Sequence, residues 1–229
     1  YVLGLKYAES PFAIHTVGST IVCTDDAYVS VQGMNKRKAA EDFYFMEKLA
    51  KLYNIYKIEG TTIFPSGRGS WRVPFGTGQR VNRFLSKTRD EYELYSPQSF
   101  ELLRKWNEIY YRKKIYTAIE YLNIAKELNI NLYNFLISNS FEVTWDKIYS
   151  HSRTSEQLSR QKKMWFDGFR TLKLIHYLRD VEFSNEQMFD ALDSMFELKQ
   201  IDFKDRRQSA AVPDLDVQIE YLNILRDFT

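Results

Sequence analysis

Glycine is unevenly distributed along this 229-residue sequence: eight of the nine glycines lie at or before Gly78, and the ninth is Gly168. Glycine permits the backbone conformations that turns and ligand-contact loops need. Charge divides in the same way, because residues 1–87 hold 12 basic and 7 acidic side chains whereas residues 88–229 hold 20 basic and 23 acidic ones. The sequence therefore predicts an α+β protein in two parts, with an α/β portion at residues 1–87 and a mainly α-helical domain at residues 88–229.

The composition excludes several classes of protein. A net charge of +2 gives no general electrostatic attraction for nucleic acid. Cys23 is the single cysteine, which excludes an internal disulfide and a cysteine-rich zinc site. No apolar run approaches the roughly 20 residues that span a bilayer. We expect a cytoplasmic protein, with association at the inner face of the membrane left open, and we expect the natural protein to extend before Tyr1.

The first 87 residues combine strand-like and helix-like patterns. Short β-type apolar runs occupy residues 14–24, a short helix is expected at 25–32, and a strand is predicted at 55–63. Residues 39–52 predict a stronger helix, because apolar side chains recur there at spacings of three and four. Residues 65–81 predict a long loop, and such loops in compact domains are usually functional or disordered.

The remaining sequence has helical periodicity almost throughout. Helices are predicted at 97–127 (as one kinked helix or two), 131–138, 141–149, 154–181, 185–199 and 214–228. Ser184 is the expected N-cap of the fifth of these. Trp106, Trp145 and Trp165 are expected to anchor the core.

The most informative stretch is GMNKRKAAEDFYF, residues 33–45. Glu41 and Asp42 stand in the first turn of the expected amphipathic helix, just after the basic residues 36–38. A helix N-terminus stabilises carboxylates, so an ionised general base is physically natural at this place. The simpler interpretation, that the pair only complements the helix macrodipole, explains the same residues.

The order of these elements resembles the acceptor half of family 2, GT-A type glycosyltransferases. In that family a glycine-rich strand leads to a Gly-Gly turn and then to a Glu-Asp motif that opens an amphipathic helix. The matching pieces here are Gly18-Ser19, Gln32-Gly33-Met34 and Glu41-Asp42, with Gln32 standing before the single glycine of the turn. Residues 65–79 also resemble the loop that follows this motif in some bacterial members. The resemblance covers residues 1–87.

What the resemblance implies is an inverting transfer of a sugar from a nucleotide sugar to a hydroxyl of a glycan or lipid-linked acceptor. Asp42 would be the general base that removes the hydroxyl proton, with Glu41 as its neighbour or as an orienting group. The leaving nucleoside diphosphate needs positive charge or a metal, and guanidinium groups bind phosphate in a bidentate way. The expected substrate-binding residues are His15, Gly18, Ser19, Arg68, Trp71, Arg72 and Arg80.

The family also implies a divalent metal, magnesium or manganese, held by an Asp-x-Asp motif in a nucleotide-binding half. Asp25 and Asp26 are adjacent rather than spaced, and Asp214 and Asp216 have the spacing but open the last predicted helix. The resemblance therefore implies that the nucleotide-binding half lies upstream of Tyr1 and that this chain alone does not catalyse transfer.

Two other hypotheses explain the same sequence. In one, the chain is a non-enzymatic interaction module whose helices dock a partner. In the other, Glu41 and Asp42 serve as the carboxylate pair of a glycoside hydrolase. Adjacent residues of a helix point about 100° apart, which argues against the hydrolase.

The other polar candidates are predicted to be structural. His151 and His176 lack paired ligands at metal spacing, and Cys23 is expected to be a packed thiol in an apolar strand. The basic run at residues 160–163 is either a solvated face beside a core stripe or a membrane-surface face.

Overall fold

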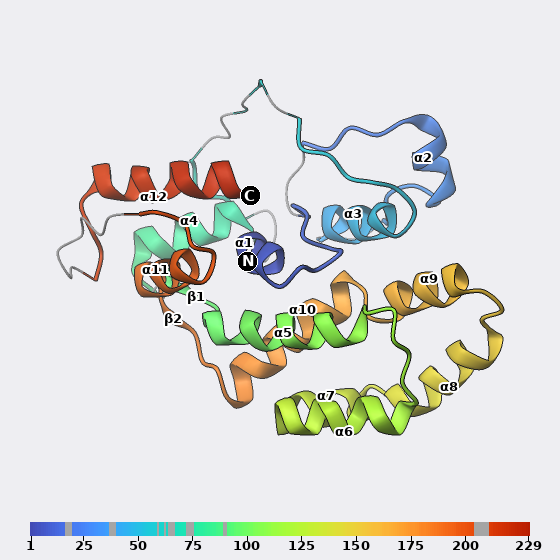
Figure 1. Cartoon of the computed structure of the whole chain (residues 1–229). Helices are drawn as coiled ribbons and strands as arrows, with labels where there is room; N and C mark the ends of the chain where they lie inside the picture. The colour runs from blue at the N-terminus through green and yellow to red at the C-terminus, as the bar shows by residue number, and fades with distance from the viewer. Residues whose placement is uncertain are drawn as a thin grey trace. The chain divides into compact units, whose positions relative to one another are not determined.

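The computed structural model describes residues 1–16, 20–36, 40–58, 60–61, 63, 67–71, 76–88, 91–203 and 211–229. In these ranges the chain is mainly helical, with 12 helices and one two-stranded sheet (Figure 1). None of these helices combines the length and the apolar character that a membrane crossing requires.

The chain divides into two compact units. The helical unit consists of residues 1–13 and 92–229, and the insert unit consists of residues 14–91. The expected division after residue 87 differs from this one, because residues 88–91 fall in the insert unit and the first 13 residues fall in the helical unit. They belong to the helical unit because α1 (Val2–Tyr7) packs on α5 (Pro97–Tyr110).

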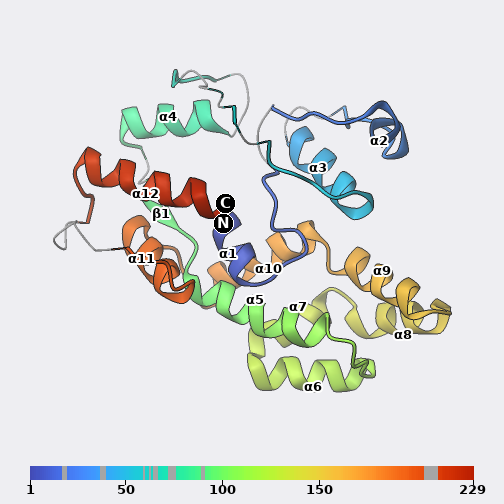
Figure 2. The same cartoon turned by 45° about the horizontal axis from the view of Figure 1, so that its top comes forward.

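The helical unit contains nine of the described helices. After α1 and α5 they are α6 (Ala118–Leu128), α7 (Ile130–Ser138), α8 (Phe141–His151), α9 (Ser155–Trp165), α10 (Gly168–Val181), α11 (Met188–Leu198) and α12 (Leu215–Phe228). Figures 1 and 2 show α6 and α7 side by side. Asn129, which joins them, caps α7 by accepting hydrogen bonds from two of its first backbone amides. The single sheet pairs β1 (Glu93–Leu94) antiparallel with β2 (Glu186–Gln187).

Local capping explains where several helices begin, and it corrects two predictions. Thr117 and Glu120 form a reciprocal capping box at the start of α6. The single helix predicted at 154–181 is two helices, because Asp167 caps α10 with a 2.8 Å bond from the Arg170 amide. Ser184 is not the N-cap of α11. Gln187 fills that role and accepts from the two amides that follow Met188.

An aromatic cluster forms the centre of the helical unit. Its members are Trp106, Tyr110, Tyr121, Phe141, Trp145, Trp165 and Phe166. Trp106 stacks on Tyr110 with ring centroids 5.3 Å apart, and Tyr121 meets Trp145 edge-on at 4.9 Å. The prediction that Trp106, Trp145 and Trp165 anchor the core is confirmed, since all three are buried.

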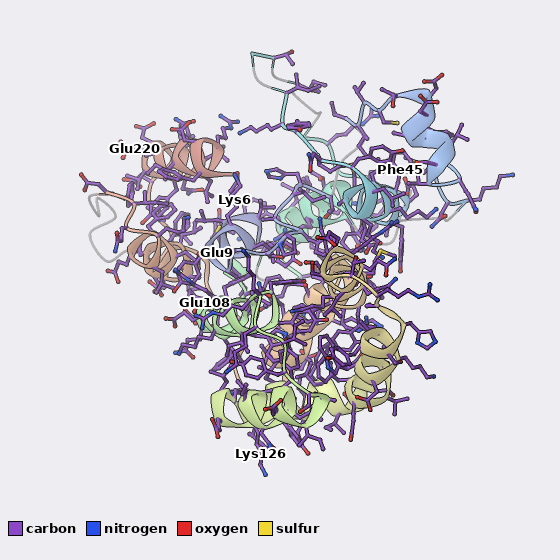
Figure 3. The ribbon with its side chains drawn as sticks, turned by 45° about the vertical axis from the view of Figure 1, so that its right-hand side comes forward. Lys6, Glu9, Phe45, Glu108, Lys126 and Glu220 are labelled. Carbon is purple, nitrogen blue, oxygen red and sulfur yellow. The ribbon has the colours of Figure 1, made fainter. Side chains whose placement is uncertain are left out.

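The insert unit has a much smaller core. Its helices are α2 (Asp25–Ser30), α3 (Glu41–Leu52) and α4 (Thr77–Ser86). Buried side chains of α2 and α3 pack together, and Phe45, labelled in Figure 3, lies 5.7 Å from the ring centroid of Tyr28. The helices predicted at 25–32 and 39–52 are thus confirmed over residues 25–30 and 41–52.

The strands predicted in the insert unit are wrong for the residues that the structure describes. Neither 14–24 nor 55–63 holds a described strand residue. Val22 and Tyr56 are each 79% exposed, so these apolar side chains are not buried against other residues. A strand needs a neighbour to complete its ladder of hydrogen bonds. Cys23 is likewise exposed rather than a packed thiol.

Candidate functional site

The turn between α2 and α3 is tied to the middle of α3 by one lysine. The Nζ atom of Lys48 donates hydrogen bonds to the Val31 carbonyl at 3.1 Å, to the Gly33 carbonyl at 3.4 Å and to Asn35 Oδ1 at 2.9 Å. Three acceptors satisfy the three donors of an ammonium group. The turn at residues 31–35, which includes the Gln32-Gly33-Met34 segment of the resemblance, is therefore tied to α3.

Gly33 is required in this turn for two reasons. Its φ is +67°, in the left-handed region, and the preceding Gln32 also has a positive φ of 58°. A Cβ atom at position 33 would lie 2.9 Å from the ring of Tyr28. Any other residue at position 33 would be strained at this φ and would have to displace the Tyr28 ring.

Glu41 and Asp42 are half-buried in the first turn of α3. The N-cap residue, Ala40, makes no side-chain hydrogen bond to the helix, and Glu41 and Asp42 are the acidic residues of its first turn. Asp42 Oδ1 accepts a 2.8 Å bond from the Phe43 amide. This geometry orients the Asp42 carboxylate at a helix N-terminus, where an ionised carboxylate is stabilised.

Arg80 lies in a helix rather than in the predicted loop. Residues 77–86 form α4, and the segment Gly67–Trp71 packs against its beginning. The Ser70 amide donates to the Gly78 carbonyl at 3.2 Å, and Asn82 Nδ2 donates to the Ser70 carbonyl at 3.1 Å. The structure thus brings Arg68 and Trp71, both exposed, into the same local assembly as Arg80.

Two arginines of α4 share one carboxylate. Glu91 accepts from Arg80 Nε through Oε2 and from Arg83 Nε through Oε1, both at 2.7 Å. Burial acts to raise the pKa of Glu91, but the hydrogen bonds from Arg80 and Arg83 outweigh it, and the pKa is lowered. Arg80 is therefore engaged in an ion pair. A phosphate bound to Arg80 would have to replace the Glu91 carboxylate or bind beside it.

The other expected site residues are placed as follows. His15 is exposed, whereas Gly18, Ser19 and Arg72 lie outside the described residues. The structure therefore brings together Glu41 with Asp42 in one assembly, and Arg68 and Trp71 with Arg80 in a second. Lys48 and Glu91, which organise these two assemblies, were not identified from the sequence.

The Asp-x-Asp metal chemistry implied by the resemblance does not fit the described residues. They hold no group of three or more His, Cys, Asp or Glu side chains placed to bind a metal ion. Asp25 and Asp26 occupy the first turn of α2, behind the cap residue Thr24. Asp214 is the N-cap position of α12 and Asp216 lies in its first turn, as predicted.

The two remaining histidines have local partners, in line with structural roles. His176 forms a 2.8 Å hydrogen bond with the Tyr95 hydroxyl, and burial lowers its pKa, helped by the charge of Arg179. His151 bonds through Nδ1 to the Lys147 carbonyl at 2.7 Å.

The basic run at 160–163 is not uniformly a solvated face. Lys162 is 4% exposed and lies in the aromatic cluster, whereas Arg160 is exposed. The Lys162 nitrogen lies 5.1 to 5.9 Å from the ring centroids of Tyr110, Trp145 and Tyr121. The helical spacing does indicate this burial, because Lys162 follows Leu158 by four positions and so lies on the same buried face of α9.

Comparison with protein-family models, with curated proteins and with solved structures finds no match for this chain.

Proposed function

We propose that this chain is the acceptor-side portion of an inverting glycosyltransferase that transfers a sugar from a nucleotide sugar to an acceptor hydroxyl. Asp42 is the general base and Glu41 helps to orient the acceptor. The nucleotide sugar, and the divalent metal that accompanies it in the family resembled, are held by a part of the protein outside this sequence.

The observation that carries the proposal is the fixed relation between the Gly33 turn and the start of α3. The three hydrogen bonds of Lys48 hold the turn, and the first turn of α3 presents Glu41 and Asp42. A pair of carboxylates that only favoured the helix macrodipole would not need a turn of defined geometry in front of it. A general base does need a fixed position, because proton transfer requires hydrogen-bond reach.

In the proposed step, the acceptor oxygen forms a bond to the anomeric carbon of the donor while Asp42 takes the hydroxyl proton. The bond between the anomeric carbon and the nucleoside diphosphate breaks, and the diphosphate leaves with the electron pair. Positive charge stabilises that leaving group. Arg68 is an exposed candidate in the insert unit for this contact.

The test uses the natural protein that contains this sequence, and measures release of nucleoside diphosphate from a panel of nucleotide sugars with saccharide acceptors. We expect Asp42→Asn to lower turnover by a factor of about 10²–10⁴. The matched control is Asp26→Asn, which removes an exposed carboxylate from the first turn of α2. Retained turnover in a folded Asp42→Asn protein would reject Asp42 as the base. A natural protein that consumes none of the nucleotide sugars would reject the proposed activity.

A second candidate function, a helical interaction module, is favoured by one feature of α12. Leu215, Ile219 and Leu222 are exposed at spacings of four and three, so they form an apolar stripe on one face of the helix. The partner that fits such a stripe is another amphipathic helix, and α12 of a second copy carries one.

Sedimentation velocity tests this alternative directly. Self-association that Ile219→Lys abolishes, and that the neighbouring exposed change Asn223→Lys leaves intact, would favour the interaction module. A chain that stays monomeric at all concentrations would remove a second copy as the partner of this stripe.

A further inference from the structure

A groove with a volume of about 660 Å³ runs between α8 and α9 in the helical unit. These two helices are packed against each other and are joined by residues 152–154 (Figures 1 and 2). One side of α8 contributes Lys147 and His151, and one side of α9 contributes Arg160 and two glutamines. The groove is thus built from two helix faces and the turn that connects them.

Charge in this groove has one sign. Lys147, Arg153 and Arg160 line it together with His151, and no aspartate or glutamate is among its lining residues. The helical unit as a whole holds 20 basic and 22 acidic residues, so its net charge is negative. The groove therefore concentrates positive charge on a unit of the opposite overall sign.

These cations have no carboxylate partner within 4 Å among the residues that the structure describes. Glu156 stands four residues before Arg160, a spacing that allows an ion pair on a helix. Its carboxylate instead bonds to the Ser155 hydroxyl at 3.1 Å. The positive field of the groove is therefore not neutralised from within the helix, and is available to an external anion.

The groove is also held in shape by its own hydrogen bonds. The side chain of Thr154 caps α9 by accepting from the Gln157 amide. Gln157 Oε1 accepts from the Arg153 amide at 2.9 Å, which orients the side-chain NH₂ group of the glutamine as a further donor. The Nδ1 atom of His151 donates to the Lys147 carbonyl at 2.7 Å, because a carbonyl only accepts.

We propose that the groove between α8 and α9 is a binding site for a phosphate-bearing anion. Guanidinium, ammonium and amide groups line it from both helices and from the turn between them, and such groups form short, charge-assisted hydrogen bonds with phosphate oxygens. The ligand is a free phosphate compound or the phosphate headgroup of a lipid, since both present the same oxygens. This site lies in the helical unit and is independent of the sugar transfer proposed for Asp42.

The experiment titrates the full chain with inorganic pyrophosphate by isothermal calorimetry. A second arm measures cosedimentation with phosphatidylcholine vesicles that contain or lack phosphatidylglycerol. The test variant is Lys147→Gln with Arg160→Gln. The matched control is Lys105→Gln with Lys113→Gln, which removes two exposed cations outside the groove. Thermal unfolding checks that both variants are folded.

We expect binding in at least one arm, weakened about tenfold or more in the groove variant and nearly unchanged in the control. Binding should also weaken as salt is added. Pyrophosphate binding without vesicle binding assigns a free phosphate compound, and vesicle binding alone assigns a lipid headgroup. Equal weakening in both variants, or no binding in either arm, would overturn the proposal.

Discussion

The side-chain nitrogen of Lys162 lies 5.1 Å from the ring centroid of Tyr110, at a position where the lysine is almost wholly buried. Its hydrogen bonds, to the Arg112 carbonyl at 3.4 Å and to the Tyr121 hydroxyl at 3.5 Å, are long. Burial lowers the pKa of Lys162 to about 8. Aromatic rings attract a cation, but they replace only part of the hydration that the ammonium group loses.

Replacing Lys162 with methionine should therefore stabilise the helical unit at neutral pH. Methionine has a similar length, fills irregular core space and carries no charge. We expect the free energy of unfolding in urea to rise by about 1–2 kcal/mol at pH 7. Lys105→Met, at an exposed position of α5, should change it by less than about 0.5 kcal/mol. A loss of stability in Lys162→Met would show that the cation–π contacts outweigh the desolvation of the charge.

The same lysine predicts a pH dependence of stability. The folded protein releases the Lys162 proton near pH 8, whereas the unfolded chain holds it until the ordinary value of 10.5. Between these values the unfolded state binds more protons, so the contribution of Lys162 to the free energy of unfolding rises with pH. The stability advantage of Lys162→Met should accordingly shrink as the pH is raised from 8 toward 10.5. A constant difference between the two proteins over that range would contradict the lowered pKa.

Trp106 should be the most costly core residue to truncate. It is fully buried and stacks on Tyr110, and its indole N–H has no hydrogen-bond partner among the described residues. We expect Trp106→Ala to lower the free energy of unfolding by about 3–5 kcal/mol. Trp106→Phe should cost much less, because it keeps a ring and removes the unpaired donor. Trp71→Ala is the matched control, since Trp71 is 78% exposed and its loss should have little effect.

The helical part of the fold was predictable because its signals are local. Periodic apolar residues and bulky tryptophans indicate helices and core positions without knowledge of what packs on them. The break between α9 and α10 also has a local cause, the Asp167 cap, but the apolar periodicity continues across it and predicts one helix. The predicted strands failed for a different reason: a strand exists only beside another strand, and one segment cannot show that neighbour.

The candidate site was predictable to a similar extent. The position of Glu41 and Asp42 in the first turn of α3 follows from helix periodicity and from the preference of carboxylates for helix N-termini. Lys48 could not have been identified, because its acceptors include two main-chain carbonyls 15 and 17 residues earlier, which leave no pattern in the sequence. The glycines before Arg80 dominate the pattern and predict a loop there, although α4 begins at Thr77.

The order of α4 should depend on Glu91. No residue of α4 is buried, so the packing of this helix gives little stabilisation. Glu91 forms ion pairs with Arg80 and Arg83, and both of these arginines lie in α4. We expect Glu91→Gln to speed amide hydrogen exchange in α4, while Glu93→Gln, an exposed change in β1, does not. The pKa of Glu91 is lowered in the folded state, so its stabilising effect is present above the ordinary value of 4.5. That effect is lost as the pH falls through the lowered value. Unchanged exchange in Glu91→Gln would show that α4 is ordered without this ion pair.

Comparing Lys48→Met with Asp42→Asn should separate effects on the stability of the α2–α3 assembly from effects on sugar transfer. Lys48→Met removes the donor of three hydrogen bonds and leaves the Val31 and Gly33 carbonyls without it. We expect it to destabilise the insert unit by about 1–3 kcal/mol, measured as faster hydrogen exchange in residues 25–36. Lys36→Met, an exposed change in the same turn, is the control. Asp42→Asn keeps an oxygen that can accept from the Phe43 amide and loses the charge at the helix N-terminus, which is worth about 0.3–1 kcal/mol. A folded Asp42→Asn protein is therefore expected, and any loss of sugar transfer in it reports on the carboxylate. If Asp42→Asn destabilised the insert unit as much as Lys48→Met, the carboxylate would be structural, and the simpler interpretation of the Glu-Asp pair would be favoured.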